Sequence, residues 1–416
     1  MLIQFSFKNF KSFKDETLLD LTASSVKEHP YNVIETETGD KYLKVSAIYG
    51  SNASGKSNVI EAFSFMRKFV LNSLTSATDE DKHHKKTIPV KRFLFDHTSK
   101  KEPAEFEVFF QHLNTEYQYG FTVDSDKIHA EWLYSKTPKG NSFSTLYERS
   151  GNKFKFGKKM KHAEIFANAV DDKTLFLTLT ARTKVKISQK VNEWFFEQFV
   201  VDFGDIDFEQ FISRVFPEEV MDDEDYKQRL ENFLSAIDTG IISLRIEKTG
   251  AKSEEGEEAI NVYSNHIVNE HGDTIEIPFN EESSGTRKMF LLFYFFNDAL
   301  QNGYTLFVDE LNAKLHPLLV RYIIQLFHNP EINKHNAQFI FTTHDHYTLT
   351  RDVFRRDEVW FTEKDRMGNS KLFSLVEYKI DEHTKVRNDA SYNKDYMAGR
   401  YGAIPLLKEF NLLEGS

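Results

Sequence analysis

The stretch that decides the fold is IYGSNASGKSNVIEAF, residues 48–63. An apolar lead-in runs into Gly50, four residues separate it from Gly55, and Lys56 and Ser57 follow at once. Glycine suits a chain that turns with positive φ and brings its backbone against a phosphate. Apolar residues then recur at helical spacing, so the stretch has the pattern of strand, loop and helix. It predicts a phosphate-binding loop whose helix offers its positive N-terminal end to the anion.

The predicted loop comprises Gly50, Ser51, Asn52, Ala53, Ser54, Gly55, Lys56, Ser57 and Asn58. In this pattern the backbone N–H groups wrap the phosphates of a nucleotide. The Lys56 ammonium would reach the β and γ oxygens, and the Ser57 hydroxyl would bind Mg²⁺. The expected ligands are therefore ATP and Mg²⁺.

The composition limits what else the chain can be. Its 416 residues exceed one ordinary domain, and 40% hydrophobic with 28% charged residues is typical of globular proteins. There is no cysteine, which excludes disulfides and thiolate metal sites and favours a reducing compartment. No signal peptide and no run of about 18 apolar residues is present, so we expect a cytoplasmic protein with no membrane partner. The net charge of −11 argues against bulk attraction to nucleic acid.

Two further apolar strands end in polar side chains. TLFVDEL, residues 305–311, ends in Asp309 and Glu310, where the first carboxylate would complete the metal site and the second would polarise water as a general base. QFIFTTHD places His344 after the second strand. A histidine there can hydrogen-bond a γ-phosphate and respond to its presence.

A second helix start with phosphate-binding chemistry lies in EESSGTRK, residues 281–288. Its Ser283, Ser284, Gly285 and Thr286 supply hydroxyls and free N–H groups at a positive helix end. Such a site is redundant if the loop at 50–57 already holds the nucleotide. We therefore predict that it acts on the nucleotide of a second copy of the chain.

The remaining patterns suggest three units. Residues 1–160 begin with strands at 2–7 and 17–23 and end with short alternating runs from 92 onward, typical of an antiparallel meander. Residues 161–270 are mainly helical, with strands returning near the end, and are expected to form an insert. Residues 271–416 carry the second helix start, the two apolar strands and the tail. The expected fold class is α/β.

Taken in order, these motifs resemble those of ABC-type ATPase heads, and more narrowly the single-head bacterial ATPases of the structural-maintenance, RecF and overcoming-lysogenization-defect families. The match is carried by NFKSFKD, GSNASGKSN, ESSGTRKMF, DELNAKLHP, FTTHD and YMAGRYGAIP. This set is similar to the AbiL- and RloA-type ATPases of the AAA15 group, found in phage-defence loci. It covers residues 1–125 and 275–405; the middle carries little of it.

The resemblance implies a Mg²⁺-dependent ATPase of P-loop type, with a mixed sheet, a β meander and a mainly helical insert. It assigns Glu310 as the catalytic base and His344 as the switch residue. Ser284 and Gly285 would act in trans in a head-to-head dimer or higher homo-oligomer. Lys11 and Ser12 would lie beside the adenine base or the α-phosphate of the nucleotide. The protein would control a separately encoded effector, such as a nuclease, in abortive-infection defence.

The signature motif of these ATPases corresponds here to Ser283, Ser284, Gly285 and Thr286. It departs from the Ser-Gly-Gly-Gln of transporters, which argues against a transporter role. No glutamine loop can be assigned, although residues 175–182 are the region where we expect it. The 72 residues after His344 are too few for an added nuclease domain, and FTEKDRMG lacks a paired Asp-x-Asp.

Two other functions remain open. One is a RecF-like DNA-repair or scanning clamp, with nucleic acid as a partner. The other is a nuclease site in the middle of the chain, built from Asp202, Asp205, Asp207, Asp222, Asp223 and Glu224. The basic cluster at 153–162 is either a solvated rim or a contact surface for an anionic partner. The tail at 396–405 either caps the sheet or contacts a partner.

Overall fold

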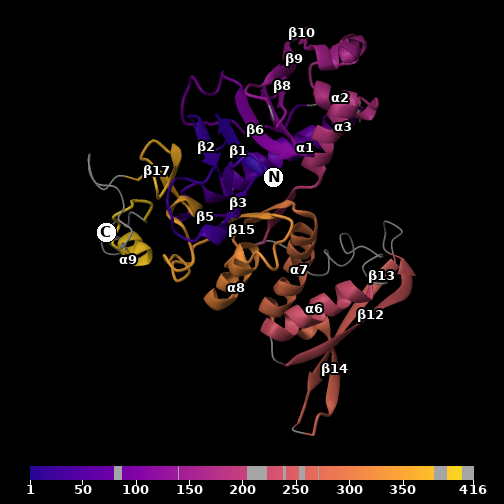
Figure 1. Cartoon of the computed structure of the whole chain (residues 1–416), viewed down its shortest axis with the longest axis vertical. Helices are drawn as coiled ribbons and strands as arrows, with labels where there is room; N and C mark the ends of the chain where they lie inside the picture. The colour runs from indigo at the N-terminus through magenta and orange to yellow at the C-terminus, as the bar shows by residue number, and fades with distance from the viewer. Residues whose placement is uncertain are drawn as a thin grey trace, which may run out of the picture.

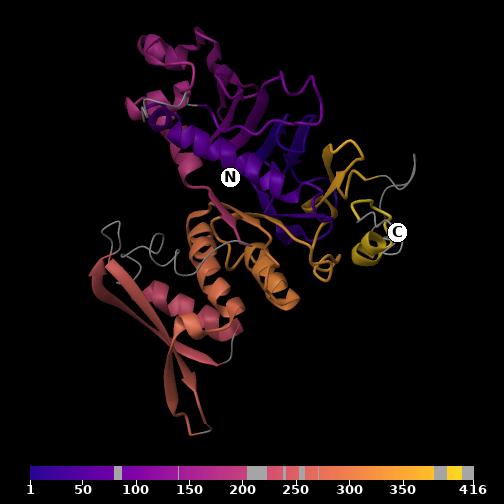
Figure 2. The ribbon, with the colours of Figure 1, turned by 180° about the vertical axis from the view of Figure 1, so that it is seen from behind.

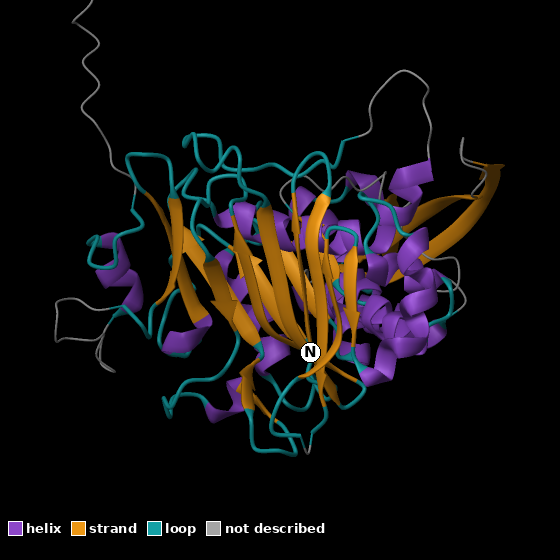
Figure 3. Cartoon of the chain, turned by 90° about the horizontal axis from the view of Figure 1, so that it is seen from above, coloured by secondary structure: helices purple, strands orange, loops and turns teal. Residues whose placement is uncertain are grey.

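The computed structural model describes residues 1–78, 87–138, 140–203, 223–237, 240–252, 258–269, 271–378 and 391–404. Within these ranges the chain forms an antiparallel sheet, a long helix, a mostly parallel sheet and a second set of helices, stacked in that order (Figure 1). Seen from above, the strands run through the middle of the molecule (Figure 3). The fold is α/β, as the sequence predicts.

The mostly parallel sheet has the strand order β11-β15-β16-β5-β17-β18. Its strands are β5 (Val45–Gly50), β11 (Phe199–Asp202), β15 (Thr305–Asp309), β16 (Gln338–Thr342), β17 (Val359–Lys364) and β18 (Ser370–Ser374). The first five run parallel, and β18 pairs antiparallel at the edge. Every residue of β5, β15 and β16 is buried, which is typical of parallel strands covered on both faces.

The antiparallel sheet has the strand order β10-β9-β8-β7-β6-β1-β2. Its strands are β1 (Leu2–Lys8), β2 (Thr17–Asp20), β6 (Ala104–His112), β7 (Thr115–Val123), β8 (Ile128–Lys136), β9 (Ser144–Ser150) and β10 (Lys153–Phe156). The predicted meander therefore begins at residue 104. Residues 92–96, expected as a strand, form a loop, because the Phe93 N–H bonds to the Asn9 side chain at 3.2 Å instead of to a neighbouring strand.

Helix α1 (Lys56–Thr78) lies between the two sheets (Figure 2). Phe63 in its second turn contacts both: its ring centroid is 5.3 Å from that of Phe5 on β1 and 4.1 Å from that of Phe307 on β15. Helices α2 (Phe176–Arg182) and α3 (Lys186–Phe196) pack against the same core. This packing fixes the start of α1, and with it the loop before it, against the end of β5.

The opposite face of the parallel sheet is covered by α7 (Ser284–Asn302), α8 (Pro317–His328) and the described part of the tail, which contains α9 (Tyr392–Met397). Tyr396 stacks on Phe361 of β17 with ring centroids 5.3 Å apart, and Tyr401 lies 5.6 Å from the same ring. Residues 391–404 therefore cap the sheet of their own chain, whereas Pro405 lies outside the described residues.

A smaller unit projects from α7 (Figure 1). It consists of α6 (Glu224–Ile237) and the antiparallel strands β12 (Ile241–Lys252), β13 (Glu258–Ile267) and β14 (Thr274–Pro278). Other parts of the middle range return to the head: β11 pairs with β15 in the parallel sheet. The division at 160 and 270 stays a prediction.

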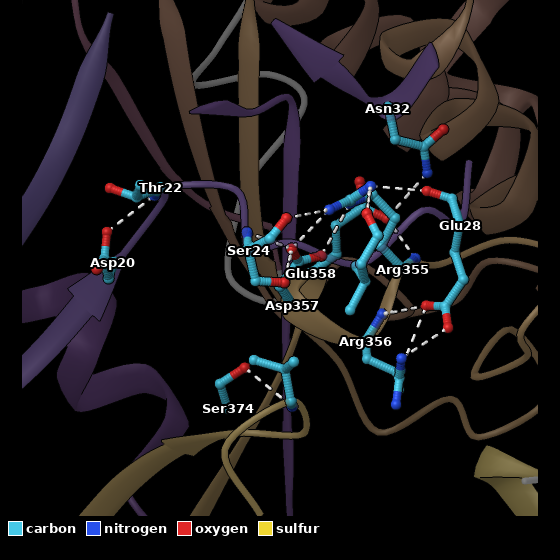
Figure 4. Close-up of polar contacts among 12 residues, drawn as sticks. Asp20, Thr22, Ser24, Glu28, Asn32, Arg355, Arg356, Asp357, Glu358 and Ser374 are labelled. Atoms are coloured by element: carbon cyan, nitrogen blue, oxygen red, sulfur yellow. Dashed lines mark hydrogen bonds and ion pairs between the residues drawn. The ribbon is translucent and has the colours of Figure 1, made fainter. Parts of the chain in front are cut away.

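A polar cluster joins residues 24–32, the segment before β3 (Val33–Glu35) and its partner strand β4 (Lys41–Leu43), to residues 355–358 just before β17 (Figure 4). The buried Arg355 pairs with Asp357 at 2.7 Å, and the same carboxylate accepts from Ser24 Oγ at 2.6 Å. The fully buried Glu358 accepts from Asn32 Nδ2 at 2.9 Å. Because each buried charge is partnered, this cluster fixes β17 beside β5 without an uncompensated charge.

Among the described helices, none has the length and apolar character needed to cross a membrane.

Candidate functional site

The carboxyl ends of the parallel strands meet at one edge of the sheet, where a cleft of about 480 Å³ opens. Open α/β sheets bind ligands at this edge. The cleft is lined by Asn52, Ala53, Gly55, Lys56, Ser57, Asn58, Glu310, His344 and Lys364. The fold therefore brings the loop after β5, the carboxylate after β15 and the histidine after β16 into one place.

The two glycines of the loop have no room for a side chain. A Cβ on Gly55, whose φ is +115°, would lie 2.7 Å from Ser370 Oγ. A Cβ on Gly50 would collide with the hydroxyl and carbonyl oxygens of Thr362. Both neighbours belong to β17 and β18, so the loop needs glycine where it passes these strands. The result is a backbone cradle of the kind that wraps phosphates.

Lys56 lies inside this cradle and is only 5% exposed. Its ammonium donates to the carbonyl oxygens of Gly50 and Ser51, both at 3.0 Å. Burial lowers the pKa of Lys56 to about 8, while the carboxylates of Asp309 and Glu310 act in the opposite direction. An anion in the cleft would stabilise the charged form of this side chain.

The two carboxylates after β15 are held differently. Asp309 is buried, and its Oδ1 accepts a hydrogen bond from Thr342 Oγ1. Glu310 is exposed to the cleft, and its backbone N–H donates to the same hydroxyl at 2.8 Å. Its φ of 53° is unusual for a residue with a side chain, and such strain is typical of functional sites. One threonine thus fixes the backbone of one acid and the carboxylate of the other.

Asn312, two residues after Glu310, fixes the backbone of His344. Asn312 Oδ1 accepts from the His344 backbone N–H and from Thr343 Oγ1, both at 2.9 Å. Partial desolvation and the neighbouring Lys56 lower the pKa of His344. The ring is therefore neutral near pH 7 and can either donate or accept a hydrogen bond.

Lys11 and Ser12 lie beside the loop rather than in it. Ser12 Oγ accepts from Asn58 Nδ2 and from Ser370 Oγ, both at 2.7 Å. The Lys11 ammonium pairs with Glu61 on α1, and desolvation together with the nearby Lys91 lowers its pKa. Neither belongs to the described residues that line the cleft.

The start of α7 also stands apart. Ser283 caps the helix by accepting from the Thr286 N–H at 3.1 Å, and Ser284 is exposed. A Cβ on Gly285 would lie 3.3 Å from the Lys314 carbonyl oxygen, so this turn packs against the loop that follows β15. Within the described part of the chain, none of the four signature residues lines the cleft.

The structure adds residues that sequence reasoning missed. Thr342 lies two residues before His344 and Asn312 two residues after Glu310, so the available signal was a polar side chain close to each motif residue. Lys364 lines the cleft from the end of β17, a strand that was not predicted. Asp202, which the sequence offered only for the nuclease alternative, is in register with Asp309 on the adjacent parallel strand, at the same sheet edge.

Two expectations for the middle range have different outcomes. Residues 175–182, where a glutamine loop is expected, contain α2 from Phe176 onward, and the Thr178 hydroxyl donates to the Val70 carbonyl oxygen of α1 at 2.6 Å. The glutamine loop stays unassigned. For the nuclease alternative, Asp205, Asp207 and Asp222 lie outside the described residues. Within the described ranges, no three acidic or histidine side chains are placed to share a metal ion.

Fold and site together define a nucleotide-binding head of P-loop ATPase type. The chain belongs to the family described as "AAA domain, putative AbiEii toxin, Type IV TA system", whose model matches residues 45–350. The matched range includes the phosphate loop, the start of α7, both acids after β15 and His344. The finer grouping with AbiL- and RloA-type ATPases stays a prediction.

Similar solved structures include two of the recombination mediator protein RecF in the RecFOR pathway. The RecF-ATPrS structure is 13% identical over 90% of this chain and 98% of that chain, with a TM-score of 0.37. The RecF-ATP structure is 13% identical over 89% and 97%, with a TM-score of 0.30. No curated protein matches the chain significantly.

Proposed function

We propose that this protein binds and hydrolyses ATP with Mg²⁺ and acts as a nucleotide-driven switch between separate and joined heads. The observation that carries the proposal is the single cleft shared by the phosphate loop, Glu310 and His344. An anion cradle and an exposed carboxylate can position the phosphates and activate water for phosphoryl transfer, and the imidazole adds a hydrogen-bonding group beside them.

Each group has a defined task. The backbone of residues 50–57 and the Lys56 ammonium would hold the phosphates and fix the nucleotide in the cleft. Glu310 would accept the proton of the attacking water, because its side chain reaches the cleft while its backbone is fixed by Thr342. His344 would hydrogen-bond the γ-phosphate from the end of β16.

The residues present also suit Mg²⁺. Ser57 offers a hydroxyl and Asp309 a carboxylate oxygen, and hard oxygen donors are the ligands this ion prefers. Asp309 is buried and held by Thr342 Oγ1, so its orientation is set before any ligand arrives. When bound, Mg²⁺ neutralises negative charge on the phosphate oxygens.

Two copies are needed to complete this site. Ser284 is exposed at the start of a helix of 19 residues, where the helix dipole favours an anion, yet it does not belong to the lining of its own cleft. In a head-to-head dimer each Ser284 and Gly285 would meet the γ-phosphate held by Lys56 of the other copy. Hydrolysis would then release the pair.

The enzymatic part is tested by measuring phosphate release from ATP with wild-type protein and with Lys56→Ala. We expect the substitution to remove Mg²⁺-dependent hydrolysis and ATP binding. Lys68→Ala is the matched control, because Lys68 is an exposed lysine on the same helix. Equal turnover by the Lys56→Ala protein would contradict the proposal.

The switch would control a separately encoded effector in phage defence. This step is supported by the resemblance to phage-defence ATPases and by the family description, which names a toxin of a type IV TA system. In cells that carry the gene with its neighbours, Lys56→Ala should raise phage plating to the level of undefended cells. Plating that is equally low with both proteins would rule out this role.

A further inference from the structure

A second concave site lies between the turn that contains Lys11 and residues 90–100, in the loop that precedes β6. Its volume is about 630 Å³. Four of its lining side chains are cationic, Lys11, Lys91, Arg92 and Lys100, and the others, among them Leu94 and Phe95, are apolar. No carboxylate belongs to the described residues that line it. In a chain with net charge −11 this concentration of positive charge is local.

The loop that forms the pocket is held rigidly by a buried side chain. Asn9 is 1% exposed, and its Nδ2 donates to the carbonyl oxygens of Ser99 and Glu102, both at 2.8 Å. Its Oδ1 accepts from the Phe93 N–H. The Lys11 N–H donates to the Lys91 carbonyl oxygen at 2.7 Å. The pocket is therefore formed by the fold before any ligand binds.

The charge of the pocket is not cancelled by its surroundings. Asp96, the nearest carboxylate in sequence, is engaged by Ser99 Oγ at 2.9 Å and by Lys14 at 3.2 Å. Lys11 pairs with Glu61. Within the described part of the chain, Lys91 and Lys100 have no ion-pair partner. Two cations are thus available to an anionic ligand.

The apolar side of the pocket is unusually open. Phe95 is 69% exposed and Leu94 is 64% exposed. Phe95 rests on the turn between β17 and β18, since a Cβ on Gly368 would lie 3.0 Å from its ring. Its ring centroid is 5.7 Å from that of the buried Phe93, in an edge-to-face contact. An aromatic ring fixed in this way, beside free cations, is a surface on which a planar base can stack.

We propose that this pocket binds single-stranded nucleic acid, with a base stacked on Phe95 and adjacent phosphates bound by Lys91, Arg92 and Lys100. A strand fits better than a duplex, because paired bases are already stacked and cannot present a face to Phe95. Stacking of a base on Phe95 and contacts between the cations and phosphates carry no sequence information, so binding would tolerate many sequences.

The test is fluorescence anisotropy of labelled 15-nucleotide oligo-dT and oligo-U with the full-length protein, without ATP. Phe95→Ala should weaken binding about tenfold, in line with the loss of one stacked base. Lys91→Gln with Lys100→Gln should reduce the slope of log K against log salt by about 1.4, since each phosphate contact on a single strand contributes about 0.7.

Matched controls separate the pocket from general surface effects. Phe196→Ala removes another exposed phenylalanine, 71% exposed, and should leave binding unchanged. Lys158→Gln with Lys159→Gln removes two exposed cations from the basic cluster at 153–162 and should leave the slope unchanged. If this pair lowers the slope as much as the pocket pair does, the assignment to the pocket is wrong.

Two other results would overturn the proposal. If the wild-type protein binds neither oligonucleotide at 50 mM salt, single-stranded nucleic acid is excluded as the ligand. A Phe95→Ala protein that loses ATP affinity but keeps oligonucleotide affinity would assign the pocket to the base of the nucleotide in the neighbouring cleft. Lys56 does not line this pocket, so the Lys56→Ala protein should bind the oligonucleotides as the wild type does.

Discussion

The starts of α1 and α7 present similar chemistry in different settings. Both combine glycine and serine hydroxyls at the positive end of a helix. The start of α1 is enclosed by strand ends and faces Glu310 and His344, whereas at the start of α7 Ser284 is exposed and Gly285 packs against the loop after β15. This difference supports our proposal that one chain carries two complementary halves of a site that a second copy would complete.

The largest loss of turnover is expected from substitution of Glu310, the proposed general base. Glu310→Gln removes the proton acceptor but keeps the size of the side chain and the backbone bond to Thr342. Turnover should fall by about 10²- to 10⁴-fold, the usual contribution of a general base, while ATP affinity changes little. Steady-state phosphate release and equilibrium ATP binding check both parts. The exposed Glu331→Gln is the control, and wild-type turnover by the Glu310→Gln protein would contradict the assignment.

The second prediction concerns Ser284, which is exposed at the start of α7. Ser284→Arg places a bulky side chain at the start of α7 and should block the approach of a second head, so turnover should fall at least tenfold. Because Ser284 does not line the cleft of its own chain, ATP binding by single heads should persist. Ser144→Arg, at the exposed end of β9, is the matched control. Loss of ATP binding by the Ser284→Arg protein would mean that the helix acts in cis.

Thr342→Val tests the bond that links the two acids. Removing the hydroxyl leaves the buried Asp309 and the Glu310 N–H without their partner, which should cost about 1–3 kcal/mol of unfolding free energy and lower turnover. Thr178→Val should cost a similar amount, since its buried hydroxyl also makes two hydrogen bonds, donating to the Val70 carbonyl oxygen and accepting from Ser73 Oγ, but it should keep turnover per folded molecule. Chemical denaturation and single-turnover hydrolysis separate the two effects. Equal turnover of the two variants would show that the Thr342 hydroxyl does not support hydrolysis.

The smallest effect is a pH dependence of ATP affinity. Burial holds the pKa of Lys56 at about 8, below its ordinary value of 10.5. Below pH 8 the ammonium is already charged and binds phosphate directly. Above pH 8 the free protein must take up a proton to bind, so affinity should fall by up to tenfold per pH unit. Lys56→Arg keeps its charge across this range.

Calorimetric titration from pH 6.5 to 9.5 is the measurement. The Lys56→Arg protein should bind more weakly but with a flatter profile. A wild-type affinity that stays constant to pH 9.5 would contradict the role of Lys56.

Much of the cleft could be predicted because it is built from local signals. A strand, a Gly-x4-Gly-Lys-Ser loop and a helix are adjacent in sequence, and each acid or histidine follows its own apolar strand directly. Parallel strands then bring these ends to one edge. The partners that fix them were not predictable in the same way, because Thr342 and Asp309 are 33 residues apart and meet only through strand pairing.

The sequence was less informative where tertiary contacts override local pattern. Residues 92–96 alternate like a strand but are held as a loop by the distant Asn9. The short β11 has an ordinary apolar pattern, and its place beside β15 depends on packing against α7 and on strand pairing. The tail gave two open alternatives, and the ring contacts of Tyr396 and Tyr401 with Phe361 show that its described part caps the sheet of its own chain.

The most direct test of the account is the mass in solution of Glu310→Gln protein with and without ATP and Mg²⁺. Because the blocked base should hold ATP between two heads, we predict an ATP-dependent doubling of mass. Adding Ser284→Arg to the same protein should abolish the doubling without removing ATP binding. A mass that ATP does not change in Glu310→Gln, or that still doubles with Ser284→Arg, would contradict the claim that α7 completes the site of a second copy.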